Sequence, residues 1–176
     1  MISNWNGYND APEDDSIYKW FCRAYIHIEE PDEVDIVDTH IVNNECSGGG
    51  IVKGKTLHKT FSFRNVTIES NTYEIADGGA ITVNPVHQET DYSIVLDGVR
   101  LLSNNNSIYG GMGALALDET YDYQQNLVTL NITNCVFDSN HASKSAAIKW
   151  VGLSLYITNT TFIGNTMNSE STVTFN

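Results

Sequence analysis

A repeat anchored on asparagine occurs five times and restricts the fold of this chain more than any other feature. The anchors are Asn44, Asn71, Asn104, Asn140 and Asn165. Large apolar residues stand three places before them, at Ile41, Ile68, Leu101, Phe137 and Phe162. Small or β-branched residues stand five places before, at Thr39, Val66, Val99, Cys135 and Thr160. Further apolar residues stand eight places before, at Ile36, Phe63, Leu96, Ile132 and Ile157, and ten places before, at Val34, Phe61, Ile94, Leu130 and Leu155. A turn-forming residue stands six places before, at Asp38, Asn65, Gly98, Asn134 and Asn159.

A run of small residues that ends in an aliphatic residue follows each anchor. The runs are Gly48-Gly49-Gly50-Ile51, Gly78-Gly79-Ala80-Ile81, Gly111-Met112-Gly113-Ala114-Leu115, Ser145-Ala146-Ala147-Ile148 and Ser171-Thr172-Val173. This alignment places Ile51, Ile81 and Leu115 at one position of the repeat. Small residues there allow neighbouring backbones to approach closely.

The alternation has period two and predicts strands rather than helices. Each repeat has three of them, exemplified by residues 81–83, 130–132 and 135–137. Three strands and three turns in a repeat of this length predict an all-β fold, a right-handed parallel β-helix of about five coils. A β-sandwich has similar strands but does not explain why one register recurs five times in order.

The register makes three further predictions. Phe137 and Phe162 should stack in the core, in one column with the apolar residues three places before the other anchors. Asn65, Asn134 and Asn159 should lie in left-handed turns between the second and third strands, with Asn134 and Asn159 stacked. Cys135 should be a buried thiol in the same column as Val66 and Val99.

Three tetrapeptides carry a family resemblance. Gly78-Gly79-Ala80-Ile81, Phe137-Asp138-Ser139-Asn140 and Phe162-Ile163-Gly164-Asn165 resemble the paired GGAI and FxxN motifs of the polymorphic outer-membrane protein family, whose best-known members are chlamydial surface adhesins. The resemblance covers residues 34–176, although copies one to three have Ile or Leu in place of Phe. It implies a β-helix and an adhesive role at a cell surface.

Composition excludes several other functions. The 176 residues carry a net charge of −13, and such a surface repels nucleic-acid phosphates, so we expect no nucleic-acid partner. No apolar run approaches the roughly 18 residues of a membrane span. The three cysteines have no metal-binding spacing, and a bridge between Cys22 and Cys46 is left open by the sequence.

The two ends differ from the middle of the chain. We divide it into residues 1–33, a polar, acidic N-terminal segment with an opening coil or cap, and residues 34–176, the repeats. Residues 173–176 correspond to the first strand of a sixth coil. We therefore expect either a piece of a longer protein or self-association through an open solenoid end, with residues 171–176 covered by a neighbouring chain or poorly ordered.

The sequence gives little support for a metal site or for a catalytic site. The acidic stretch 29–35 lacks the spacing of a calcium loop, so we expect no metal and no cofactor. Pectate lyase-like chemistry needs clustered aspartates with a base, or paired acids. Arg64 and Arg100 face outward on different strands, and we expect Asp97 to lie near Arg64 as a surface ion pair. We therefore expect no enzyme activity and name no catalytic residue.

The insertions between the first and second strands are the candidate ligand-binding region. They run over residues 54–60, 84–92 and 118–126 and should protrude along one edge. Aromatic and acidic side chains that suit sugars or protein loops occur there, at His87, Asp91, Tyr92, Asp118, Tyr121, Asp122 and Tyr123. Of the N-x-Ser/Thr sequons, Asn105 and Asn131 are the expected glycan acceptors, because the others lie in the turn ladder.

The sequence thus predicts a segment of a non-enzymatic, structural or adhesive β-helix protein that is extracellular or exposed at the cell surface. Its expected partner is a protein or glycan on a host or neighbouring cell. A carbohydrate-active enzyme or carbohydrate-binding module is the first alternative. A virion spike or filament subunit is the second.

Overall fold

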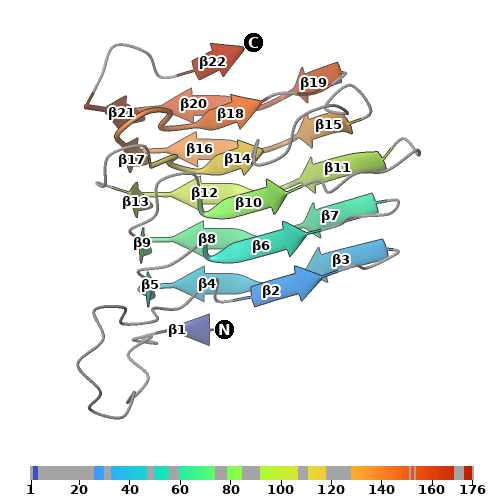
Figure 1. Ribbon diagram of the computed structural model, residues 1–176, viewed down its shortest axis with the longest axis horizontal. Helices are drawn as coiled ribbons and strands as arrows, with labels where there is room; N and C mark the ends of the chain where they lie inside the picture. Colours follow the sequence, from blue (N-terminus) through green and yellow to red (C-terminus); the bar gives the residue numbers. More distant parts are fainter. Residues whose placement is uncertain are drawn as a thin grey trace, which may run out of the picture.

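The chain forms a parallel β-helix in which each complete coil contributes one strand to each of four sheets (Figure 1). The computed structural model describes residues 2–3, 26–29, 33–46, 50–55, 60–73, 79–84, 92–106, 111–117, 128–150, 152, 154–168 and 173–175. All strand pairs in this part of the chain are parallel. The all-β solenoid predicted from the repeat is therefore confirmed.

The four sheets are numbered in the order in which a coil visits them. Sheet I contains β2 (Ile26–Glu29), β6 (Val52–Lys55), β10 (Ile81–Asn84), β14 (Leu115–Leu117), β18 (Ile148–Trp150) and β22 (Val173–Phe175). Sheet II contains β3 (Glu33–Val37), β7 (Thr60–Arg64), β11 (Tyr92–Asp97), β15 (Val128–Thr133) and β19 (Ser154–Thr158). Sheet III contains β1 (Ile2–Ser3), β4 (His40–Val42), β8 (Thr67–Glu69), β12 (Arg100–Leu102), β16 (Val136–Asp138) and β20 (Thr161–Ile163). Sheet IV contains β5 (Glu45–Cys46), β9 (Thr72–Tyr73), β13 (Asn105–Asn106), β17 (His141–Ala142) and β21 (Thr166–Met167).

The fourth sheet was not expected from the sequence. Its strands have two residues each and follow the anchors directly, so only one side chain per strand points inward. Where those side chains are described, they differ in size and polarity, from Tyr73 and Asn106 to Ala142 and Met167. Because period two cannot be recognised in a two-residue strand with so variable an inward position, the sequence predicted three strands where the coil has four.

The core runs as a continuous apolar column through the middle of the solenoid. The residues three places before the anchors lie in register, in the order Ile41, Ile68, Leu101, Phe137 and Phe162. The rings of Phe137 and Phe162 stack with centroids 4.8 Å apart and an interplanar angle of 17°. This confirms the predicted stack, although Phe162 remains 38% exposed because it lies in the last strand of sheet III.

A buried ladder of hydrogen bonds joins the five anchors. At each step, Oδ1 of the upper asparagine accepts from both the main-chain N–H and Nδ2 of the asparagine below, with N···O distances of 2.9–3.2 Å. Each upper Nδ2 also donates to a main-chain carbonyl of the coil below, at 2.8–3.2 Å from Ile41, Ile68, Leu101 or Phe137. Asparagine suits this position because its amide supplies a donor and an acceptor together, which a buried backbone corner needs.

Two columns of left-handed turns flank sheet III. All five residues six places before the anchors have positive φ, as the sequence predicted. Their side chains form an exposed ladder, in which Nδ2 of Asn159 donates to Oδ1 of Asn134 at 2.7 Å and Nδ2 of Asn65 donates to Asp38 at 2.7 Å. The residues just before the anchors, Asn43, Ser70, Ser103, Ser139 and Gly164, also have positive φ. This second column was not predicted, because serine at such a position is not a turn signal by itself.

The small-residue run follows the predicted pattern, but its first copy is shifted by one residue. Val52, not Ile51, pairs with Ile81, and Ile81 pairs with Leu115. Three consecutive glycines precede Ile51, so the sequence alone offered no means of choosing between neighbouring alignments. The close approach itself is real, because a Cβ on Gly50 would collide with the carbonyl oxygen of Gly79 in the next coil.

The N-terminal end of the solenoid is covered by an early part of the chain. β1 lies beneath β4, with Ile2 opposite Ile41, and β2 provides the first strand of sheet I. Ile41 is fully buried as a result. The described residues include no helix that is long and apolar enough to cross a membrane.

Candidate functional site

The predicted ligand-binding residues fall mainly outside the described part of the chain. His87, Asp91, Asp118, Tyr121, Asp122 and Tyr123 all lie outside the described residues. Tyr92 is the first residue of β11, and its backbone pairs with Val128 at the start of β15. The two longest insertions therefore lead directly into neighbouring strands of sheet II.

The outer face of sheet II beside these insertions is mainly polar and carries no charge, with Val95 as an apolar member beside Asn131. We call it the sheet II polar face and define it by Ser93, Thr129, Asn131, Ser154 and Tyr156. Ser93 lies beside Thr129 and Thr129 beside Ser154, while Asn131 lies beside Tyr156. Tyr156 is 58% exposed and the other four side chains are partly buried.

The spacing of this face follows from the parallel sheet. Neighbouring coils place equivalent residues about 4.8 Å apart, and outward residues along a strand recur about every 6.6 Å. Hydroxyl and amide groups supply uncharged hydrogen-bond donors and acceptors, and the exposed Tyr156 ring offers an apolar surface with a polar tip. The face can thus bind an uncharged polar ligand by hydrogen bonds and ring stacking.

The same sheet is charged toward its N-terminal end. Arg64 on β7 forms a salt bridge with Asp35 on β3, and its Nε donates to Oδ1 of that aspartate at 3.1 Å. Ser62 also donates to Oδ1 of Asp35, at 2.6 Å. The hydrogen bond from Arg64, followed by that from Ser62, lowers the pKa of Asp35 below its ordinary value. Bonding to the same carboxylate raises the pKa of Arg64.

Arg64 thus pairs with the coil below it rather than with the coil above. The sequence had led us to expect Asp97 as its partner, and Asp97 is indeed opposite Arg64 in the strand register. The carboxylate of Asp97 instead accepts a hydrogen bond from Nδ2 of Asn134 at 3.0 Å, while the salt bridge joins Arg64 to Asp35. The neighbouring carboxylates of Asp97 and Asp38 still favour the charged form of Arg64.

His141 and His40 each contact a side chain of the next coil. Nδ1 of His141 lies 3.0 Å from Oγ1 of Thr166, and Nε2 of His40 lies 3.4 Å from a carboxylate oxygen of Glu69. Cys135 is a free, buried thiol in the column of Val66 and Val99, as predicted, and burial raises its pKa. Within the described ranges, no three His, Cys, Asp or Glu side chains come together as metal ligands.

The two expected glycan acceptors occupy different surroundings. Asn131 is partly buried in the middle of β15, where it belongs to the sheet II polar face between Val95 and Tyr156. Asn105 lies on β13 in sheet IV, and its buried Oδ1 has no hydrogen-bond partner among the residues that the structure describes. Neither observation tests glycosylation, which stays a prediction.

Sequence reasoning did not single out Tyr156, the most exposed large apolar side chain described. The signal was available, because Tyr156 stands nine places before the anchor Asn165, between the inward positions Leu155 and Ile157. That place is occupied by Asp35, Ser62, Val95 and Asn131 in the other copies, so an aromatic residue there departs from the pattern.

Comparisons with known proteins give no relative for this chain. No protein-family model matches the sequence, and neither the curated proteins nor the solved structures contain a match.

Proposed function

We propose that this chain is a non-enzymatic structural and adhesive segment of an extracellular or surface-exposed protein, and that it binds a glycan of a host or neighbouring cell. The observation that carries the proposal is the sheet II polar face. It offers hydroxyls, an amide and the exposed ring of Tyr156 on a rigid parallel sheet. In a protein of net charge −13, an uncharged polar face favours a neutral ligand over an anionic one.

The rest of the fold supports a presenting role. The buried asparagine ladder and the continuous core hold the coils in one fixed register. A face on such a scaffold keeps its spacing without an ordering cost on binding. The candidate insertions at residues 84–92 and 118–126 adjoin the same sheet, and the GGAI and FxxN resemblance suggests adhesion independently of these contacts.

The test is binding of the full chain to an array of neutral and acidic glycans, followed by calorimetric titration with the best ligand. Replacement Tyr156→Ala should weaken binding about tenfold, because loss of an aromatic anchor costs about 1–2 kcal/mol. Thr161→Ala is the matched control, since Thr161 is exposed in the same coil but lies on sheet III. It should leave the affinity unchanged.

Two outcomes would contradict the proposal. One is the absence of any glycan ligand, and the other is binding that Tyr156→Ala does not affect. Release of shortened or unsaturated sugar products from a bound polysaccharide would favour the alternative of a carbohydrate-active enzyme.

A further inference from the structure

One N-x-Ser/Thr sequon lies in the column of turn residues six places before the anchors. It consists of Asn65, Val66 and Thr67, and Asn65 is exposed in the left-handed turn between β7 and β8, with a φ of 52°. The fully buried Val66 holds this turn against the core. The sequence argument had set Asn65 aside as a member of the turn ladder, but that ladder is exposed. An exposed asparagine in a surface turn is the usual place of an N-linked glycan.

The side-chain amide of Asn65 has room for a modification on its nitrogen. Nδ2 carries two hydrogens, and it donates to Oδ1 of Asp38 in the coil below at 2.7 Å. An N-linked glycan replaces one hydrogen of Nδ2 and leaves the other. The hydrogen bond to Asp38 can therefore persist after Asn65 is glycosylated.

The coil above Asn65 has no side chain at the equivalent place, because Gly98 stands there with a φ of 65°. A Cβ added to Gly98 would lie 3.7 Å from the main-chain nitrogen of Asn65, so this missing side chain belongs directly above Asn65. Asn134, one coil higher, bonds to Asp97 instead of to the residue six places before its neighbouring anchor. Gly98 thus leaves space beside the Asn65 amide in the middle of the solenoid.

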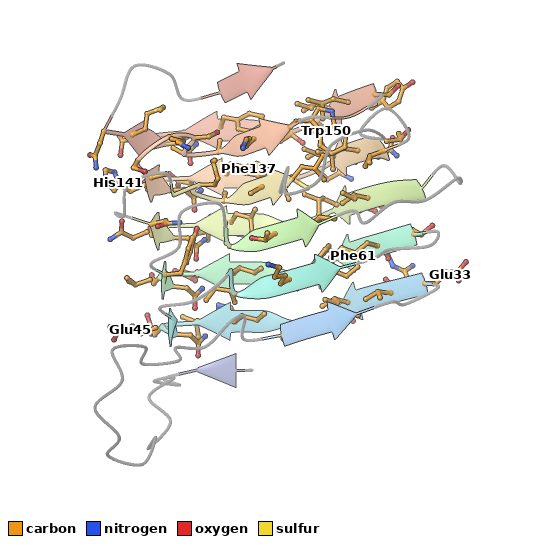
Figure 2. All side chains as sticks on the ribbon, viewed as in Figure 1. Glu33, Glu45, Phe61, Phe137, His141 and Trp150 are labelled. Carbon is orange, nitrogen blue, oxygen red and sulfur yellow. The ribbon has the colours of Figure 1, made fainter. Side chains whose placement is uncertain are left out.

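The two acceptors expected from the sequence are more enclosed. Asn131 is partly buried in the middle of β15, with Tyr156 beside it in the next coil. Asn105 lies in β13 between Thr72 and His141, and Figure 2 labels His141 on the sheet IV side of the solenoid. The Oδ1 atom of Asn105 is buried. A glycan on either asparagine would have to displace side chains of a neighbouring coil.

We propose that Asn65 is an N-glycosylation site and that its first sugar lies over Gly98. The donor is an oligosaccharide linked to a lipid pyrophosphate. The bond between C1 of the sugar and the pyrophosphate oxygen breaks, and C1 bonds to Nδ2 of Asn65. The lipid pyrophosphate leaves with the bonding electron pair, and the amide loses one proton. The inference rests on the extracellular location proposed above, but not on the binding of a glycan by sheet II.

The fold selects among the sequons after the sugar has been transferred. Sequons are modified as the chain enters the secretory pathway, before the coils form. A chain with a glycan at Asn65 can complete its coils, whereas a glycan within β13 or β15 opposes their packing. A glycan at Asn131 would also cover the sheet II polar face, and a glycan at Asn65 leaves that face open.

Secretion of the full chain from eukaryotic cells, behind a cleavable signal peptide, tests the proposal at any natural location of the protein. Enzymatic deglycosylation in heavy-oxygen water marks each formerly modified asparagine, and mass spectrometry of peptides then gives the occupancy of each site. In the secreted protein, occupancy should be at least about tenfold higher at Asn65 than at Asn105 or Asn131. The reverse ranking, or secreted protein without sugar at Asn65, overturns the proposal.

Thr67 provides a matched pair of variants. Thr67→Ser keeps the hydroxyl of the sequon and should keep the sugar, whereas Thr67→Ala removes the hydroxyl and should lose the mass of one glycan. Thr133→Ala removes the Asn131 sequon and should leave the mass of the glycans unchanged. Loss of a glycan in Thr133→Ala but not in Thr67→Ala overturns the assignment. Secretion of Thr67→Ala alone, with the unmodified chain retained in the cell, would show that the fold rejects a glycan at Asn65.

Gly98→Asn tests whether the sugar occupies the space above Asn65. Asparagine tolerates a left-handed turn, and no sequon arises because Arg100 stands at the third position. The variant should lower the melting temperature further in the glycosylated, secreted protein than in unglycosylated protein from bacteria. Equal decreases in the two forms would overturn the placement of the sugar over Gly98.

Discussion

At the scale of single residues, asparagine has two separate roles in this fold. The anchors lie inside the solenoid, where each amide satisfies main-chain groups of two coils. The asparagines six places earlier lie at an exposed corner, where a left-handed backbone is required and the side-chain hydrogen bonds are open to water. The same side chain should therefore differ greatly in its contribution to stability between the two columns.

Replacement Asn104→Ala should lower the free energy of unfolding by about 2–4 kcal/mol. It leaves the buried main-chain N–H of Asn71 without a partner, which costs about 1–3 kcal/mol, and it removes the Nδ2 hydrogen bonds to Ile68 and Asn140, each worth about 1 kcal/mol. Chemical denaturation measures the change.

The control for that variant is Asn134→Gly in the exposed column. Glycine keeps the positive φ, and Gly98 already occupies the equivalent place in the coil below. The loss should stay below about 1 kcal/mol, because only solvent-exposed hydrogen bonds are removed. Equal losses for the two variants would refute the distinction between the columns.

At the scale of elements, neighbouring coils approach each other closely just before the strands of sheet I, so only small residues fit there. Gly113 donates its N–H to the carbonyl of Ser145, and a Cβ at this position would overlap the carbonyl oxygen of Ala146. Gly79 occupies the equivalent place one coil below, where the nearest atom to an added Cβ is the Ala114 oxygen at 3.1 Å. Two glycines in one column thus tolerate a methyl group to different extents.

Gly113→Ala should cost about 1–3 kcal/mol, because the strand has to move away from the coil above. Gly79→Ala should stay within about 1 kcal/mol of the unmodified protein, since a shift of a few tenths of an ångström suffices and alanine reduces the entropy of the unfolded chain. Thermal unfolding of both variants gives the comparison. A larger loss for Gly79→Ala would argue against the observed coil spacing.

Much of the element structure could be predicted because apolar side chains in long-range columns repeat strictly. Positions such as Phe63, Leu101 and Phe137 are restricted by the residues above and below them, so the register is visible in the sequence. The glycine run before Ile51 carries no such information, since its alignment is decided by backbone contacts alone. The partner of Arg64 could not be predicted either, because a long exposed side chain can reach either neighbouring coil.

At the scale of the whole molecule, the first described coil carries more acidic residues than the described parts of the later coils. Acidic residues dominate the first coil, and Arg64 on the second coil partly neutralises them through Asp35. The candidate binding face lies on β11, β15 and β19, away from the acidic first coil. The position of this face could not be predicted from the sequence, because it depends on which side chains a stack of coils leaves exposed.

The pairing of Arg64 with Asp35 should make the stability of the protein depend on pH under acidic conditions. The pKa of Asp35 is lowered in the folded protein, so its contribution is complete above the ordinary aspartate pKa of about 3.9 and is lost as pH falls below it. Arg64→Gln should therefore be less stable than the unmodified protein at neutral pH. The difference should shrink as pH falls below about 3.9. A difference that stays constant through this range in urea titrations would contradict the assignment.

Hydrogen exchange of asparagine side chains, followed by NMR, tests the stacked-coil account most directly, because the buried and exposed ladders serve as controls for each other. After transfer to heavy water, the Nδ2 signals of Asn71, Asn104 and Asn140 should persist on the timescale of global unfolding, since their amides are buried and bonded on both sides. The Nδ2 signals of Asn65, Asn134 and Asn159 should disappear at once, because their hydrogen bonds lie at the surface. Rapid loss of both sets, or protection of the second set alone, would contradict the account.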